Sequence, residues 1–184
     1  MNKKKLIYSI SFIVLLLDQL IKVLVVNNMD LHQEIKIIKN FFSIYYVKNT
    51  GAAFSILGNQ TLLLIVVSCL CLIIIKEYIK KEKNITNLSM VSLGLIVGGT
   101  LGNLFDRIMY HAVIDYLAFD IFKYSFPVFN LADIAITTGT FLLVVGYIIE
   151  NRTGDKNERA TKKLQNWTLK KLSRRNTKII LYGK

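Results

Sequence analysis

The sequence has few of the residues on which most hydrolase sites depend. Among 184 residues there are two cysteines and two histidines, His32 and His111. The His-Glu-x-x-His and Gly-x-Ser-x-Gly motifs are absent, and no serine or cysteine has an evident histidine base, which argues against a zinc protease and a serine hydrolase. Cys69 and Cys71 lie in an apolar run, which suits packed, inert thiols rather than a disulfide or a metal site. We therefore expect neither a metal nor a cofactor.

Proline is also scarce, and apolar residues are abundant. With one proline and 53% hydrophobic residues, the chain is too apolar for an ordinary soluble domain. Its formal net charge of +12 could suggest a nucleic-acid partner. The basic residues are unevenly spread, however, and a membrane topology explains that distribution better. We expect a membrane protein that does not bind nucleic acid.

Long apolar runs predict four membrane-spanning helices. A span needs about 20 apolar residues at about 1.5 Å per residue to cross a hydrocarbon core of about 30 Å. The predicted spans are residues 6–26, 59–75, 88–105 and 131–149. Residues 1–150 are expected to form one transmembrane domain, and residues 151–184 a basic cytoplasmic tail.

The lysines and arginines between the predicted spans indicate the topology. With an even number of spans, 18 of these residues fall on the side of the two termini and 5 on the other. The positive-inside rule then predicts that both termini are cytoplasmic and that both long loops lie outside.

The segments between the spans carry further signals. Residues 35–47 are β-branched and aromatic, which predicts a hairpin turning near Asn40. The following Asn49-Thr-Gly is, taken alone, an ordinary turn signal. Gly94, Gly98 and Gly102 recur every four residues in the third span, which predicts a close approach by a neighbouring helix.

Three carboxylates collect at one end of the third and fourth spans. They are Asp106 at the end of the third span, Asp115 in the following loop, and Asp133 at the start of the fourth. Because charged groups at membrane depth cost several kcal/mol, such a cluster indicates a functional site. The predicted topology places all three at the outer leaflet.

Asp18 and Lys22 interrupt the first span four residues apart and so share one helix face. One interpretation is a paired charge that only orients the helix, with the lysine reaching outward to water. The alternative is a support for the carboxylate cluster, because an aspartate at this depth should face protein rather than lipid.

Two aspartates held close together can hydrolyse a peptide without a metal. One keeps a proton while the other remains a base, so the pair can polarise a carbonyl and activate water. Spacing alone does not identify the pair. Asp106 precedes Arg107 and could form a structural ion pair with it, whereas Asp115 has no adjacent cation. These grounds modestly favour Asp115 with Asp133.

Five blocks of the sequence, in this order between four spans, resemble those of bacterial lipoprotein signal peptidase (signal peptidase II). The resemblance covers about residues 6–149. The blocks are Asp18-Gln-Leu-Ile-Lys22, Asn49-Thr-Gly-Ala-Ala-Phe-Ser55, Gly98-Gly-Thr-Leu-Gly-Asn-Leu-Phe-Asp-Arg107, Val113-Ile-Asp115 and Phe129-Asn-Leu-Ala-Asp133.

This resemblance implies an aspartyl endopeptidase of the bacterial cytoplasmic membrane. It would remove the signal peptide from diacylglyceryl-modified prolipoproteins, cutting before the lipidated cysteine. The implied fold is all-α, with four transmembrane helices, a small extracytoplasmic β-cradle, and a short interfacial helix between spans three and four. Prolipoproteins and membrane lipid are the implied partners, and we expect a monomer.

The resemblance also assigns the site residues. The family's catalytic aspartates fall on Asp115 and Asp133. The residues that match its substrate-binding and supporting positions are Asp18, Lys22, Asn49, Asn103, Asp106, Arg107 and Asn130.

A small proton- or cation-coupled transporter is the alternative, because intramembrane acids also carry ions. Transporters tend to place such groups near the midplane and to have repeated halves. Here the acids lie at one face and no internal repeat is evident.

Overall fold

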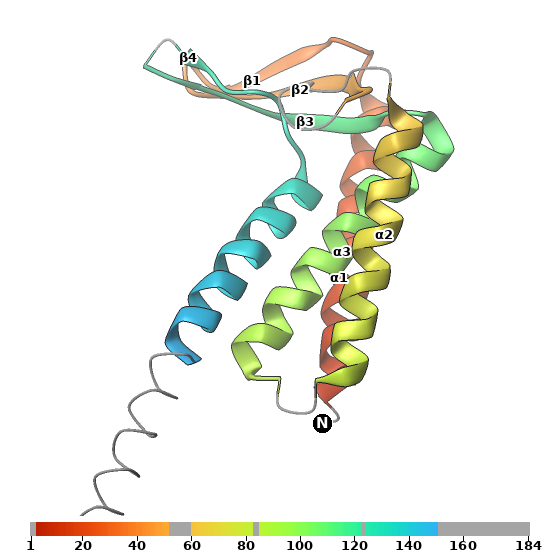
Figure 1. Ribbon diagram of the computed structural model, residues 1–184. Helices are drawn as coiled ribbons and strands as arrows, with labels where there is room; N and C mark the ends of the chain where they lie inside the picture. Colours follow the sequence, from red (N-terminus) through yellow and green to blue (C-terminus); the bar gives the residue numbers. More distant parts are fainter. Residues whose placement is uncertain (1–2, 52–59, 83–84, 123, 151–184) are drawn as a thin grey trace, which may run out of the picture. The chain divides into compact units, whose positions relative to one another are not determined.

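The computed structural model describes residues 3–51, 60–82, 85–122 and 124–150 (Figure 1). The chain divides into two compact units, residues 1–143 and 144–184. Every predicted site residue belongs to the first unit. The predicted tail at 151–184 lies outside the described residues.

Among the described residues, four helices are long and apolar enough to cross a membrane, as the prediction of four spans requires. They are α1 (Lys3–Asn28), α2 (Thr61–Lys81), α3 (Asn87–Tyr110) and a fourth helix, Leu131–Glu150. All four end beyond the apolar run that predicted them, whereas α2 begins two residues later than predicted. Cys69 and Cys71 are free on α2, and Cys69 is exposed rather than packed.

The most buried of the four spans is α3. The side-chain oxygen of Thr86 caps its first turn by accepting a hydrogen bond from the Ser89 amide. At its other end His111 adopts a left-handed conformation, with φ 55°, and its N–H donates to the Arg107 carbonyl. This end fixes where the chain leaves the span and turns into the next strand.

The glycine repeat of α3 permits the predicted close approach of a neighbouring helix, and that helix is α1. A Cβ at Gly94 would lie 2.7 Å from the Cβ of Ile10, and one at Gly98 would lie 2.7 Å from the Ser11 carbonyl oxygen. A Cβ at Gly102 would meet the carboxylate of Asp18. The repeat therefore brings the two backbones close together and makes room for a buried charge at the end of the bundle.

A four-stranded antiparallel sheet, in the order β1-β2-β3-β4, lies at one end of these helices (Figure 1). Its strands are β1 (Glu34–Ile38), β2 (Phe42–Asn49), β3 (Val113–Ile121) and β4 (Tyr124–Ser125). The predicted hairpin is confirmed, because β1 pairs with β2 and Asn40 has the positive φ of a tight turn. The pairing of β2 with β3 has a register shift between Ile44 and Val47, and Val47 pairs with Asp115 beside this shift.

The fold prediction holds in part. The expected small β-structure is present as this sheet, so the all-α label does not describe the molecule. The prediction of a helix between spans three and four is wrong. In the part of that loop that the structure describes, residues 111–122 and 124–130, the main element is strand β3, whose Val-Ile-Asp-Tyr-Leu-Ala-Phe sequence favours extended backbone.

Candidate active site

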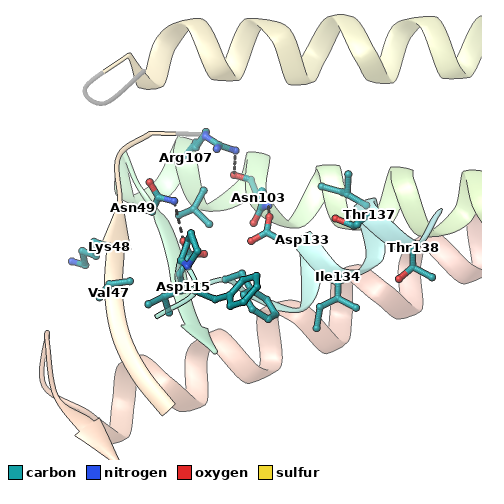
Figure 2. Close-up of a pocket in the computed structure, with 16 residues that line it drawn as sticks. Val47, Lys48, Asn49, Asn103, Arg107, Asp115, Asp133, Ile134, Thr137 and Thr138 are labelled. Carbon is teal, nitrogen blue, oxygen red and sulfur yellow. Dashed lines mark hydrogen bonds between the residues drawn. The ribbon is translucent and has the colours of Figure 1, made fainter. Parts of the chain in front are cut away.

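Asp115 lies near the start of β3, where its carboxylate is almost completely buried, at 2% exposure. Two side-chain amides donate to it. Asn49 Nδ2 donates to Oδ2 at 3.0 Å (Figure 2), and Asn130 Nδ2 donates to Oδ1 at 2.6 Å. Asn49 also forms the turn that its sequence predicts, because its Oδ1 accepts from the Gly51 amide at 2.9 Å. The turn interpretation of Asn49 is therefore confirmed, and the same side chain contacts Asp115.

Asp133 is held in the first turn of the fourth helix by a capping box. Asn130 precedes the helix, and its Oδ1 accepts from the Asp133 amide at 2.9 Å. In return, Asp133 Oδ2 accepts from the Asn130 amide at 3.2 Å. This reciprocal pair is a local consequence of the Asn-Leu-Ala-Asp sequence. It leaves Asp133 Oδ1 to accept from Asn103 Nδ2 at 2.8 Å.

Two asparagines link the two carboxylates. Asn130 Nδ2 donates to Asp115 and also to Asn103 Oδ1, at 3.1 Å. Asn103 Oδ1 also accepts from the ammonium of Lys22 at 3.1 Å. Because an ammonium only donates, it requires the oxygen of Asn103 on its side and so directs Nδ2 toward Asp133.

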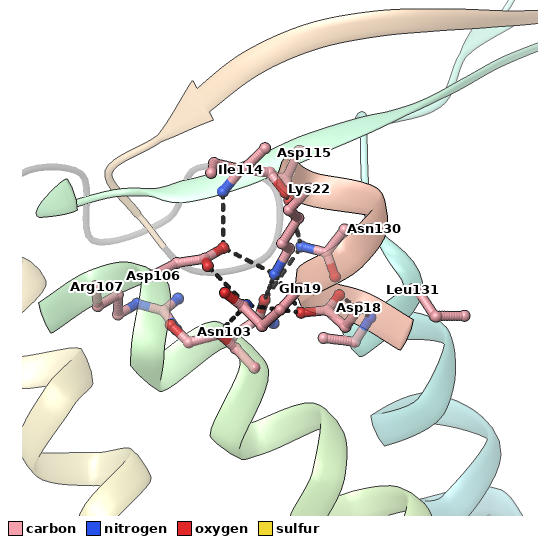
Figure 3. A network of polar contacts seen from close by, with 12 residues as sticks. Asp18, Gln19, Lys22, Asn103, Asp106, Arg107, Ile114, Asp115, Asn130 and Leu131 are labelled. Carbon is pink, nitrogen blue, oxygen red and sulfur yellow. Dashed lines mark hydrogen bonds and ion pairs between the residues drawn. The ribbon is translucent and has the colours of Figure 1, made fainter. Parts of the chain in front are cut away.

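A buried group of charged side chains from α1 and α3 adjoins the two asparagines (Figure 3). Lys22 Nζ lies 2.8 Å from a carboxylate oxygen of Asp18 and 2.8 Å from one of Asp106, and all three side chains are at most 1% exposed. Asp18 accepts from the Ala132 amide at 3.0 Å, and Asp106 from the Ile114 amide at 3.1 Å. These bonds tie the fourth helix and β3 to the bundle next to the catalytic candidates.

The structure decides between the two interpretations of Asp18 and Lys22. Their predicted ion pair is confirmed, and it supports the carboxylate cluster instead of only orienting a helix. Lys22 does not reach outward to water, because two carboxylates hold it inside the protein.

The expected ion pair between Asp106 and Arg107 is wrong. Adjacent residues point in different directions from a helix, and the cation that pairs with Asp106 is Lys22. Arg107 instead donates to the carbonyls of Asn103 and Gly51, at 3.4 and 3.2 Å. Its guanidinium forms no ion pair within 4.0 Å among the described residues. Arg107 lines the same cavity as Asp115 and Asp133.

A cavity of about 1050 Å³ opens onto both aspartates. One side of it is polar and includes Asn49, Asn103, Arg107 and the two carboxylates. The other is apolar and comes from the segment before the fourth helix and from the first turns of that helix. Its residues include Phe126, Pro127, Val128, Phe129, Ile134 and Ile136. This volume fits an extended, partly apolar chain better than an ion.

The pKa of Asp115 is raised from 3.8 to about 7, chiefly by burial and then by the charge of Asp133. The amides of Asn49 and Asn130 and the charge of Lys22 oppose this rise only in part. Near neutral pH, Asp115 is therefore partly protonated and can hold a proton inside the protein. No cluster of His, Cys, Asp or Glu that could hold a metal occurs among the described residues.

Comparison with known proteins identifies the family. The profile described as signal peptidase (SPase) II matches residues 10–149. The chain belongs to the signal peptidase II family.

Curated relatives agree with this assignment. A lipoprotein signal peptidase of Symbiobacterium thermophilum is 41% identical over 145 residues, which cover 79% of this chain and 95% of the relative. Another from Halothermothrix orenii is 41% identical over 150 residues, covering 82% of this chain and 100% of the relative. The transporter alternative is not favoured.

The fold is also similar to solved structures described as a bacterial membrane enzyme determined by the in meso method. One, at 2.3 Å resolution, has a TM-score of 0.72 and 28% identity, covering 77% of this chain and 87% of the other. A second, at 1.9 Å resolution, has a TM-score of 0.68 and 29% identity, covering 75% and 89%.

The structure brings all nine predicted site residues together. Five of them line the cavity: Asn49, Asn103, Arg107, Asp115 and Asp133. The other four, Asp18, Lys22, Asp106 and Asn130, are joined to these five by hydrogen bonds and ion pairs.

Sequence reasoning missed two further residues. Gln19 bridges Asp18 and Asp106, donating to them at 3.2 and 3.0 Å. Its place beside Asp18 in an otherwise apolar span was the available signal. The hydroxyl of Tyr116 accepts from the Leu131 amide at 3.3 Å and so helps to cap the fourth helix. No sequence signal separates that tyrosine from a packed aromatic residue.

Proposed function

We propose that this protein is an aspartyl endopeptidase that removes the signal peptide from diacylglyceryl-modified prolipoproteins, cutting before the lipidated cysteine. Membership of the signal peptidase II family supports signal-peptide removal by a multi-pass bacterial membrane protein. The observation that supports aspartate chemistry is the pair of amide-held carboxylates at one cavity, of which Asp115 is buried and has a pKa of about 7.

In the proposed mechanism the scissile carbonyl and a water molecule lie between the two carboxylates. The charged carboxylate of Asp133 takes a proton from the water, and the protonated carboxyl of Asp115 donates a proton to the carbonyl oxygen. As the C–N bond of the resulting tetrahedral intermediate breaks, Asp133 gives its newly acquired proton to the leaving nitrogen. Asp115 takes a proton back from a hydroxyl of the intermediate, so both carboxyls return to their starting states. General acid and base catalysis of this kind contributes about 10²–10⁴-fold to a rate.

The surrounding amides have a positioning role in this mechanism. Asn103 and Asn130 each present a donor to one carboxylate, and Lys22 fixes the orientation of Asn103. The buried pairs of Lys22 with Asp18 and Asp106 maintain the geometry without touching the substrate. Arg107, at the polar side of the cavity, supplies a positive charge near the developing oxyanion.

The proposed substrate also fits the two-sided cavity. The extended peptide crosses the polar side, where the aspartates lie, and the apolar side receives the hydrophobic part of the lipid-modified segment. From the charge asymmetry of the loops we propose cytoplasmic termini and an active site at the outer leaflet. We also propose that the protein acts as a monomer, because a single chain supplies both aspartates of the cavity.

Deletion and restoration in cells test this function. Deleting the gene should make full-length, lipid-modified prolipoproteins accumulate, and restoring it should convert them to the mature form. Restoring it with Asp120→Asn, a change of an exposed aspartate on β3, should work equally well. Normal prolipoprotein processing in the deletion strain, with no other peptidase of this kind present, would rule out the proposal.

A further inference from the structure

The sheet ends in a group of exposed apolar side chains, which we call the aromatic tip. Its members are Phe41, Ile121, Phe122, Tyr124 and Phe126. Phe122 is completely exposed, and the other four are 38–58% exposed. The backbone holds the two hairpin ends together, because the Asp120 amide donates to the Phe41 carbonyl at 2.9 Å. The rings of Tyr124 and Phe126 also meet edge to face, with centroids 5.3 Å apart.

The tip extends sideways from the helix bundle. The strands run across the direction of the helices, and the β3–β4 end is the one farthest from α1, α2 and α3 (Figure 1). Phe122 follows β3 and lies seven residues beyond Asp115, which at about 3.3 Å per residue is about 23 Å. A helix with its side chains is about 10–12 Å wide. The strand is therefore long enough to carry the tip beyond the width of one helix.

The chemistry of the tip suits the interface of a bilayer. Aromatic rings gather at the level of lipid headgroups, where one end of a tyrosine is apolar and the other is hydrated. Lys36 and Lys39, both exposed on the neighbouring hairpin, would favour anionic headgroups. We propose that the aromatic tip inserts into the headgroup region of the leaflet that faces the sheet and anchors the sheet to the bilayer.

A row of rings connects this anchor to the cavity. The ring centroids of Phe41 and Phe119 are 5.6 Å apart, and those of Phe119 and Phe129 are 5.7 Å apart. Phe129 lines the cavity beside the two aspartates. Insertion of the tip would thus hold one side of the cavity at the level of the headgroups. The anchor goes beyond the proposed peptidase activity and does not depend on it.

Tryptophan fluorescence can test the anchor because the chain has a single tryptophan, Trp167. The test protein carries Trp167→Phe and Phe122→Trp, so that its emission reports on the tip alone. A matched protein carries Trp167→Phe and Asp30→Trp, which labels an exposed position in the loop before β1, at the opposite end of that strand from the tip. Both are reconstituted in phosphatidylcholine and phosphatidylglycerol vesicles, with or without lipids brominated near the headgroup end of the acyl chains. Equal melting temperatures in detergent would show that both remain folded.

The proposal predicts that the tryptophan at position 122 emits at shorter wavelength in vesicles, is quenched several-fold more by brominated lipid than the one at position 30, and is shielded from aqueous iodide. Full iodide quenching without brominated-lipid quenching would overturn it. Equal lipid quenching at both positions would also overturn it, since the contact would not be specific to the tip. Short-wavelength emission that persists in detergent and depends on protein concentration would instead indicate a second copy. No outcome requires cleavage, so a failure here would leave the proposed peptidase function standing.

Discussion

Replacing Asp115 by Asn should change how stability depends on pH. In the folded protein, burial and the charge of Asp133 raise the pKa of Asp115 from 3.8 to about 7. The folded state then binds this proton more tightly than the unfolded chain, so the carboxyl contributes stability at low pH. That contribution is lost as pH rises from about 4 through about 7. Since each tenfold change in proton affinity corresponds to about 1.4 kcal/mol, ionising Asp115 costs up to about 4 kcal/mol.

The substitution Asp115→Asn removes this ionisation but keeps the side chain's volume. It also turns one acceptor into a donor opposite Asn49 or Asn130, at a cost of about 1–3 kcal/mol that does not depend on pH. Between pH 5 and pH 8 the melting temperature of the parent protein should fall relative to that of the variant. Only about 2.5 kcal/mol of this contribution is lost between pH 5 and pH 8, because part of it is already lost at pH 5. At about 2–4 °C per kcal/mol for a chain of this size, the relative change should reach about 5–10 °C.

Melting of the purified proteins in one detergent across this pH range measures the effect. Asp120→Asn is the matched control, because Asp120 lies on the same strand but is exposed and bonded to Ser125. Its melting curve should follow that of the parent at every pH. If the Asp115→Asn and parent proteins changed in parallel from pH 5 to pH 8, the raised pKa and the proton placement derived from it would be refuted.

Three further predictions concern the supporting layer and the topology. Asp106→Asn should destabilise the protein by about 3 kcal/mol, because it breaks a buried ion pair, yet leave some turnover at saturating substrate; full stability without turnover would contradict this. Gly102→Ala should lower the melting temperature, at a cost of about 1–3 kcal/mol, because its new Cβ would displace the carboxylate of Asp18. An unchanged melting temperature would contradict that packing. In a chain without its native cysteines, Ser125→Cys should react with an impermeant reagent outside intact cells and Asn157→Cys should not; the reverse pattern would overturn the topology.

The spans and the first hairpin were predictable because their signals are local. Apolar run length predicts the helices, and β-branched and aromatic composition predicts the pairing of β1 with β2. The segment after α3 was misjudged because family likeness suggested a helix there, whereas residues 113–121 are themselves strongly β-branched and aromatic. Residue composition was the better guide at that position.

The residues of the site were predictable, but the contacts among them were not. Asp106 and Arg107 are adjacent in sequence, yet the partner of Asp106 is Lys22 on another helix. Spacing shows which residues share a helix face, but it does not show which faces of two helices meet. The two-asparagine link depends on bringing α3 and the start of the fourth helix together, so it too required the structure.

Single-turnover cleavage of a lipid-modified prolipoprotein peptide by purified protein tests the central claim, that Asp115 and Asp133 together carry the chemistry. Asp115→Asn and Asp133→Asn should each reduce the rate at saturating substrate by about 10²–10⁴-fold or more while still binding a lipidated substrate analogue. Asp120→Asn should cleave at the parent rate. Near-normal turnover by either Asp115→Asn or Asp133→Asn would contradict the claim.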